Sequence, residues 1–340
     1  MAGRRRTQLA ACVRVGALLA VWQAAANVTA TAQAAAPGSA SAAASASPGA
    51  IAAAAPPGAP VLLLVSAAVA PYTATAAAVE AALRGGRGTR RVDLGGTPAA
   101  GVTALRALAP GAVGAILAVG PEAARACATA ALALPVVYAQ VLDPAASGIT
   151  ALRDAWGVST ALPASLALDR VRLHLPDVRR VGLVHEPGHG AAYAAGAAAE
   201  AKTRGLVLVS MPAATPKAVP DAWRAARGKI DALWLPPLAD PVVYDEAARR
   251  FLLDGALRDR LPVLAHFPFL RARGPVLSVE TVPDAVGAQA AALAARLAAG
   301  ERPAARLVAP ERAAVYVMAG LADRLGVRVL GGGGATVVRP

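Results

Sequence analysis

A chain of 340 residues is long enough for two domains of ordinary size, and it is 56% hydrophobic without an apolar run of membrane-spanning length after residue 30. The apolar surplus is largely alanine, a helix former, which argues against a membrane bundle. The formal net charge is +13; removing the four arginines of residues 1–14 leaves +9, scattered along the chain rather than clustered with aromatic residues, so we expect no nucleic-acid partner.

Residues 1–34 have the layout of a secretory signal peptide: a basic start, an apolar stretch over 15–28 and a small-x-small cleavage signal at 32–34. Cys12 precedes the apolar stretch, so we expect no lipid attachment there. The stretch is also shorter than the roughly 20 residues that a membrane span needs. The mature protein is therefore expected in the periplasm, starting near Ala35. Cys127, the one cysteine left after cleavage, lies among alanines and is interpreted as core packing.

Residues 35–60 are almost entirely Ala, Ser, Pro and Gly and predict a flexible tether. From residue 61, short apolar strands alternate with helical patterns across short loops, which predicts α/β structure with a parallel sheet covered on both faces. We expect strands at 61–65, 89–93, 114–119, 136–140, 181–184, 206–211, 232–235, 263–265 and 276–279. We expect helices ending near 84 and 173 and others at 99–109, 122–133, 191–202, 217–227, 241–256, 284–299 and 316–325.

The segment 175–190 contains the most conspicuous motif. An apolar strand ends in His185-Glu186-Pro187-Gly188-His189, which spells the H-E-x-x-H signature of zinc proteases. That chemistry needs both imidazoles on one helical face, and a preceding strand with Pro-Gly inside the motif argues against such a helix. We therefore predict no metal site here and favour a loop or ligand-contact role. A secreted metallohydrolase using His185 and His189 is kept as an alternative.

Several short segments, taken in their order and spacing, resemble a known family. They are 135–138 with Asp143-Pro144, Gly157-Val158-Ser159, the LPDVRRVG of 175–182, 231–236, the LPVLA of 261–265, and 322–327. Together they resemble the ABC-transporter substrate-binding proteins that include the tryptophan and tyrosine uptake proteins. The resemblance covers the chain from about residue 61 to its end.

This resemblance implies the type I periplasmic-binding fold: two doubly wound parallel-sheet lobes joined by a hinge. We assign residues 61–155 and 280–302 to the first lobe, 156–279 and 303–330 to the second, and 331–340 to a glycine-rich tail. The implied protein is not an enzyme and uses no cofactor. It traps a small molecule, such as an amino-acid-like compound, works with an ABC permease in the inner membrane, and is a monomer.

Ligands of open α/β sheets bind beyond the carboxyl ends of the strands, so the loops there supply the candidate site residues. They are Tyr72, Gly120, Asp143, Ser159, His189, Asp240 and Phe267. Asp143 or Asp240 is expected to hold a ligand ammonium group. For each residue singly, an exposed loop position or a core aromatic is an equally good interpretation. Because residues 236–240 lack the hydroxyl and amide groups expected of a pocket loop, an exported interaction protein with a degraded pocket is a second alternative.

Overall fold

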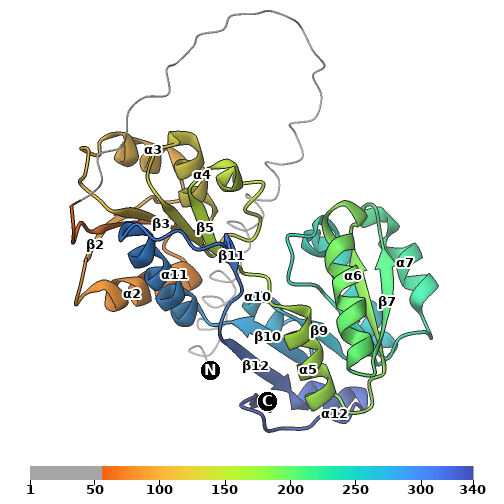
Figure 1. The fold of residues 1–340 in the computed structure, drawn as a ribbon. Helices are drawn as coiled ribbons and strands as arrows, with labels where there is room; N and C mark the ends of the chain where they lie inside the picture. Colours follow the sequence, from red (N-terminus) through yellow and green to blue (C-terminus); the bar gives the residue numbers. More distant parts are fainter. Residues whose placement is uncertain (1–55, 340) are drawn as a thin grey trace, which may run out of the picture. The chain divides into compact units, whose positions relative to one another are not determined.

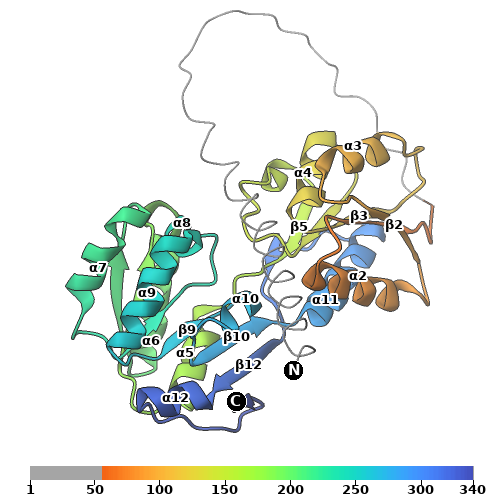
Figure 2. The same ribbon diagram turned by 180° about the vertical axis from the view of Figure 1, so that it is seen from behind.

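The computed structural model describes residues 56–339 (Figures 1 and 2). The predicted signal peptide at 1–34, and the predicted tether as far as residue 55, lie outside the described residues. The last part of the predicted tether belongs to the folded body, because the Ala59 N–H donates to Pro56 O at 3.0 Å and Ala59 is buried. Among residues 56–339, none of the helices is both long and apolar enough to cross a membrane.

The first lobe is built on a six-stranded sheet with the order β11-β5-β4-β3-β1-β2, in which every pairing is parallel. Its strands are β1 (Val61–Val65), β2 (Thr89–Asp93), β3 (Ala115–Val119), β4 (Val136–Ala139), β5 (Ala155–Val158) and β11 (Leu307–Val308). Its helices are α2 (Ala70–Leu83), α3 (Pro98–Arg106), α4 (Pro121–Ala130), the short 3₁₀ helix η1 (Ile149–Ala151) and α11 (Pro283–Ala298).

Helices cover both faces of this sheet (Figure 1). Along β1, Leu63 packs with the α2 and α11 side, whereas Leu62 packs with the α3 and α4 side. This alternation follows from the two-residue period of a strand. Because both faces are covered, all five residues of β1 are buried, and each large apolar side chain contributes roughly 1.5–3 kcal/mol. Close approach of α11 to α2 requires Gly287, where a Cβ would overlap the Thr75 carbonyl.

The second lobe is built on a seven-stranded sheet with the order β13-β12-β10-β9-β8-β6-β7, in which only the β10–β12 pairing is antiparallel. Its strands are β6 (Arg180–His185), β7 (Val207–Pro212), β8 (Ala232–Trp234), β9 (Val263–Ala265), β10 (Leu277–Thr281), β12 (Ala313–Met318) and β13 (Thr336–Val338). Its helices are α5 (Ala164–His174), α6 (Pro187–Thr203), η2 (Pro216–Ala218), α7 (Val219–Ala226), α8 (Pro241–Tyr244), α9 (Glu246–Arg258), α10 (Pro268–Arg271) and α12 (Ala319–Leu325).

The chain passes between the two sheets after β5, after β10 and after β11, which differs from the predicted lobe boundaries at 155/156, 279/280 and 302/303. Residues 155–158, for which no strand was predicted, form β5. Trp156 is fully buried in the first-lobe core, and its indole N–H donates to Pro303 O at 2.9 Å. The chain after α11 therefore returns to the first sheet as β11 before it enters the second.

Two further expectations near the end of the chain are wrong. Residues 316–318 are not helical, because Val315 and Val317 alternate with Tyr316 along β12 and place their side chains in the second-lobe core. Residues 331–340 are not a free tail, since β13 pairs in parallel with β12. Three successive glycines with positive φ, at 332–334, turn the chain into this strand, a conformation that other residues rarely adopt.

The predicted helix at 241–256 is two helices, α8 and α9, divided at Asp245. The Asp245 backbone is extended, and its side chain accepts the Ala248 N–H at 2.8 Å as the N-cap of α9. The helix predicted at 191–202 starts earlier, at Pro187. A proline suits the first position of a helix, where its missing N–H has no partner to lose.

Candidate functional site

Two predicted site residues of the first lobe, Tyr72 and Gly120, lie close together beyond the ends of β1 and β3. Tyr72 is in the first turn of α2, and Gly120 precedes α4 with φ +88°. A Cβ at Gly120 would approach the Tyr72 ring to 3.0 Å and Ser66 Oγ to 2.6 Å. Ser66 Oγ in turn accepts the Ala123 N–H at 2.9 Å. Burial, reinforced by the negative charge of Glu122, raises the pKa of Tyr72, so its phenol stays protonated and can donate.

Asp143 and Ser159 hold local turns of the first lobe. Asp143 Oδ1 accepts the Ala146 N–H at 2.9 Å, an exposed turn cap of the kind that aspartate commonly forms. Ser159 Oγ accepts the Ala161 N–H at 3.0 Å just after β5. The structure therefore gives both side chains a role in shaping the chain, Asp143 between β4 and β5 and Ser159 after β5.

The H-E-x-x-H motif is divided between a strand and a helix. His185 ends β6 with its Nε2 2.9 Å from Ser210 Oγ, whereas His189 lies in the first turn of α6 and is exposed. The prediction that no helix carries both histidines is confirmed, because the preceding strand extends to His185. The second reason given for it was wrong, since Pro187 begins the helix rather than breaking it. No group of three or more His, Cys, Asp or Glu side chains within residues 56–339 could hold a metal ion.

Glu186 is the N-cap of α6. Its Oε2 accepts the His189 N–H at 2.9 Å and lies 2.7 Å from His189 Nδ1. The Gly188 backbone N–H and the His189 side chain hold the pKa of Glu186 below its usual value. The motif thus forms a capped helix start, which is a structural role for a glutamate at this position.

Asp240 is fully buried and ties two helix starts together. Its Oδ2 accepts the Glu186 N–H at 2.7 Å, and its Oδ1 accepts the Val242 N–H at 2.9 Å at the start of α8. Burial raises the pKa of this carboxyl group. The Asp240 side chain is fully buried and each of its oxygens accepts a backbone hydrogen bond. Its role in the structure is therefore to cap helix starts, which differs from the expected role of binding a ligand ammonium group.

Phe267, the remaining predicted residue, belongs to an aromatic cluster formed by Tyr244, Phe267 and Phe269. The Phe267 and Phe269 rings stack at 5.6 Å and 17°, and Tyr244 meets Phe267 edge-on at 5.6 Å and 65°. Tyr244 and Phe269 were missed by the sequence analysis. Their positions in the sequence could have identified them, because Tyr244 follows β8 and Phe269 follows β9 at the carboxyl end of the sheet, where ligand-binding loops are expected.

Arg249 of α9 is the second residue that sequence reasoning missed. Its side chain is buried, and its guanidinium lies 5.8 Å from the centre of the Phe269 ring. Arg249 Nη1 donates to the carbonyls of Val243 at 3.2 Å and Tyr244 at 3.1 Å. Burial, together with the positive charge of Arg273, lowers the pKa of Arg249.

The two groups of site residues lie near one another. The Tyr72 phenol of the first lobe is among the groups that raise the pKa of Tyr244 in the second, after burial. In addition, Leu142, which follows β4, packs against the apolar cluster of the second lobe that contains Phe267. The carboxyl-end loops of both sheets therefore contribute to one candidate site.

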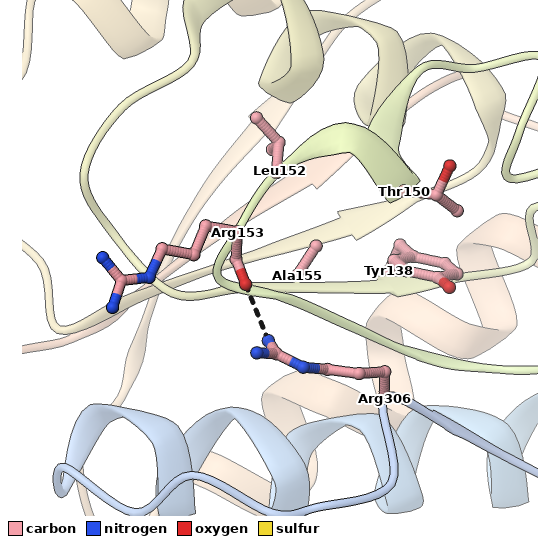
Figure 3. A pocket seen from close by; sticks show the side chains of 6 residues that line it. All are labelled: Tyr138, Thr150, Leu152, Arg153, Ala155 and Arg306. Atoms are coloured by element: carbon pink, nitrogen blue, oxygen red, sulfur yellow. Dashed lines mark hydrogen bonds between the residues drawn. The ribbon is translucent and has the colours of Figure 1, made fainter.

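Two surface hollows of the described chain lie elsewhere, on the first lobe. One, of about 260 Å³, is drawn in Figure 3, where Arg306 points toward the Arg153 carbonyl and donates to it at 2.8 Å. Its lining consists of Tyr138, Thr150, Leu152, Arg153, Ala155 and Arg306. The other, of about 500 Å³, lies beside α3, α4 and residues 145–148. Neither includes the aromatic cluster or Arg249, so we place the candidate site at the carboxyl-end loops on chemical grounds.

Comparison with known proteins agrees with this architecture. No curated protein matches the chain. A ligand-free, open substrate-binding protein with adhesive properties from Clostridium difficile aligns over 82% of this chain and 98% of its own, with 16% identity and a TM-score of 0.64. The ABC domain in complex with L-Trp from Streptococcus pneumonia aligns over 82% and 100%, with 16% identity and a TM-score of 0.54. A conserved domain protein from Vibrio cholerae aligns over 83% and 99%, with 20% identity and a TM-score of 0.55.

These structural likenesses confirm the predicted fold class: two mostly parallel sheets with alternating helices, as in type I periplasmic-binding proteins. The matching family is described as substrate binding, and the Clostridium difficile neighbour is a substrate-binding protein. The model of the family described as ABC transporter substrate binding protein matches residues 95–327, well over half of the chain and parts of both lobes. The chain therefore belongs to the ABC transporter substrate-binding protein family.

Proposed function

We propose that this protein is the exported solute-binding component of an ABC-type importer and that it traps a small molecule between its two lobes. The observation that carries the proposal is the family match across both sheets. The packing of Leu142, which follows β4, against the second-lobe cluster that contains Phe267 supports it, because it brings a carboxyl-end loop of one sheet to those of the other. The L-Trp bound to the Streptococcus pneumonia domain makes an amino-acid-like ligand one class to test.

The mechanism is binding without bond chemistry. A ligand that contacts both lobes stabilises a closed arrangement over an open one, and it can shift this equilibrium only by its difference in affinity for the two states. The three passages of the chain between the sheets, after β5, β10 and β11, are where such a hinge would bend. The closed form would dock, as a monomer, on an ABC permease in the inner membrane.

A thermal-shift screen of purified residues 35–340 tests ligand binding. The library contains amino acids, sugars and organic acids. A ligand at a hundred times its dissociation constant should stabilise the protein by about 2.7 kcal/mol, which corresponds to a rise of roughly 5 °C in Tm for a chain of this size. If no compound in the library raises the Tm, the binding function is contradicted and the alternative of an interaction protein with a degraded pocket is favoured.

Calorimetry on variants then tests whether the ligand touches both lobes. Tyr72→Ala in the first lobe and Phe267→Ala in the second should each weaken the same ligand by about tenfold or more, and scattering should show compaction upon binding. Ser39→Ala, in the predicted tether, is the control and should bind normally. Normal binding by both aromatic variants would place the ligand elsewhere.

Export is tested separately. Protein recovered from the periplasm should begin near Ala35 and carry no lipid. Retention of Met1, or a diacylglycerol on Cys12, would contradict the predicted signal peptide.

A further inference from the structure

We propose that Arg249 is an anion anchor and that the ligand is a small carboxylic acid with an aromatic or other flat apolar body. This inference rests on the proposed function, because it names the substrate class of the same site. It depends on three features of the described chain: the unfilled donors of a buried arginine, the aromatic cluster beside it, and the engagement of the nearby acids by backbone.

The first feature is the set of donors that Arg249 leaves unused. A guanidinium carries five N–H donors and keeps its charge in proteins. Arg249 is 4% exposed and uses only Nη1, toward the Val243 and Tyr244 carbonyls. Within residues 56–339, its Nε and Nη2 have no hydrogen-bond partner, and no carboxylate forms an ion pair with it. The Nε–Nη2 edge is the one that binds a carboxylate in a two-pronged, planar geometry.

The same lobe contains the completed version of this arrangement. Arg271 uses its Nε and Nη2 for two parallel hydrogen bonds of 3.0 Å to the two oxygens of Glu280. Its guanidinium also lies over the Tyr316 ring, 3.8 Å from the centroid. Arg249 likewise has an aromatic neighbour in Phe269, but the chain supplies no carboxylate to its free edge. We infer that the ligand supplies it.

The charged groups around Arg249 do not replace that carboxylate. Asp245 and Glu246 attract the guanidinium electrostatically and Arg273 repels it, and burial exceeds each of them as a cause of its lowered pKa. Asp245 uses its Oδ1 as the N-cap of α9. A buried cation compensated only in part is costly, and a bound anion would offset that cost.

The second and third features define the rest of the ligand. The stacked Phe267 and Phe269 rings, with Tyr244 edge-on, form an aromatic cluster that reaches the Arg249 guanidinium through Phe269, and aromatic rings favour packing with a flat apolar body. Of the acids expected to hold an ammonium group, Asp240 is fully buried with a backbone N–H on each oxygen and Asp143 caps a local turn through Oδ1. Neither is among the charged groups that act on Arg249. The site therefore favours an acid without an obligatory ammonium group.

Matched acid and amide probes test the inference on the wild-type protein by calorimetry. The pairs are phenylacetate with phenylacetamide, 3-phenylpropanoate with 3-phenylpropanamide, and indole-3-acetate with indole-3-acetamide. At least one acid should bind, and its amide should bind at least tenfold more weakly, because only the acid completes a charge-assisted pair. This comparison needs no variant and so does not depend on the folding of one.

Variants then assign the selectivity to one residue. Arg249→Met should weaken the acid by ten- to a hundredfold while leaving the affinity for the amide unchanged. Arg249→Lys keeps a positive charge but lacks the planar fork, so it should bind the acid at least severalfold more weakly than wild type. Arg250→Met is the matched control, since Arg250 is the next residue and is exposed, and it should bind as wild type does. If Arg249 served only to hold the Val243 and Tyr244 carbonyls, Arg249→Met would lower the stability of the protein without changing its selectivity for acid over amide.

The outcomes separate this inference from the proposed function. If amides bind as tightly as acids, or if Arg249→Met keeps wild-type selectivity, Arg249 is not the anchor although the protein still binds small molecules. If the metabolite screen finds only neutral or cationic ligands, the inference is again wrong and the function stands. If neither the probes nor the screen yields a ligand, the function itself is contradicted.

Discussion

Replacing Asp240 with alanine should lower stability rather than ligand affinity. The change removes two hydrogen bonds to backbone donors: the cap on α8 through Val242 at 2.9 Å and the bond from the Glu186 N–H at 2.7 Å. A lost cap costs about 1 kcal/mol, and a lost charge-assisted bond costs about 1.5–3 kcal/mol. Burial raises the pKa of Asp240, so the substitution also removes some desolvation cost. We expect a net loss of about 2 kcal/mol.

Urea denaturation followed by circular dichroism measures this loss, with Asp143→Ala as the control. Asp143 also caps a turn, but it is only half-buried and its side chain accepts one hydrogen bond, so its removal should cost about 0.5 kcal/mol. Once a ligand is known, folded Asp240→Ala should bind it nearly as wild type does. A change in stability below that of Asp143→Ala, or native stability combined with lost binding, would refute the capping role.

Three further results follow from buried or unusual positions. Burial lowers the pKa of His266 to about 4. Below about pH 6.5 the unfolded chain therefore binds a proton at this residue and the folded chain does not, so the free energy of unfolding should fall by about 2 kcal/mol between pH 7.5 and pH 5. The fall in His266→Gln should be smaller. A Cβ in Gly157→Ala would overlap the Tyr138 ring, so this variant should lose about 1–3 kcal/mol of stability in urea denaturation. Gly196 has open space around it, so Gly196→Ala should gain up to about 1 kcal/mol of stability. Equal effects of the two changes would contradict this packing. His189→Ala should leave the zinc content of the purified protein unchanged, and stoichiometric zinc lost in this variant would overturn our interpretation of the motif.

The strands that the sequence predicted well are bounded by turn residues, and most of them are also buried and apolar. Residues 61–65 and 263–265 match the buried strands β1 and β9 as observed, and residues 89–93 match β2, which is polar and partly exposed. Strand β5 is no shorter than β9, but it was missed because its four residues, AWGV, include a glycine, which is depleted in strands. Its place in the sheet depends on Trp156, whose burial between β5 and α11 is a tertiary contact.

The sequence alone could not tell whether an aspartate that follows a strand binds a ligand or caps a helix, and this limited the prediction of the site. An aspartate that follows a strand can hold a ligand or cap the next helix, and its neighbours in sequence are the same in both cases. What decides is which backbone N–H groups face it. For Asp240 one of these donors is Glu186, far away in the chain, so the capping role could not be predicted without the sheet order that places β6 beside β8.

Arg249 differs from the aspartates, because a periodic signal for its burial was present in the sequence. In α9 the buried residues Ala248, Leu252 and Ala256 recur at intervals of four, and Arg249 is three residues before Leu252 and seven before Ala256. These spacings place it on the same face of a 3.6-residue helix, whereas Arg250 falls outside that face and is exposed. A charge in an apolar stripe needs a partner, and neither spacing nor composition tells whether the chain or a ligand provides it. Only the structure shows that Nη1 meets carbonyls while the Nε–Nη2 edge meets no carboxylate of the described chain, and this asymmetry points to a ligand of opposite charge.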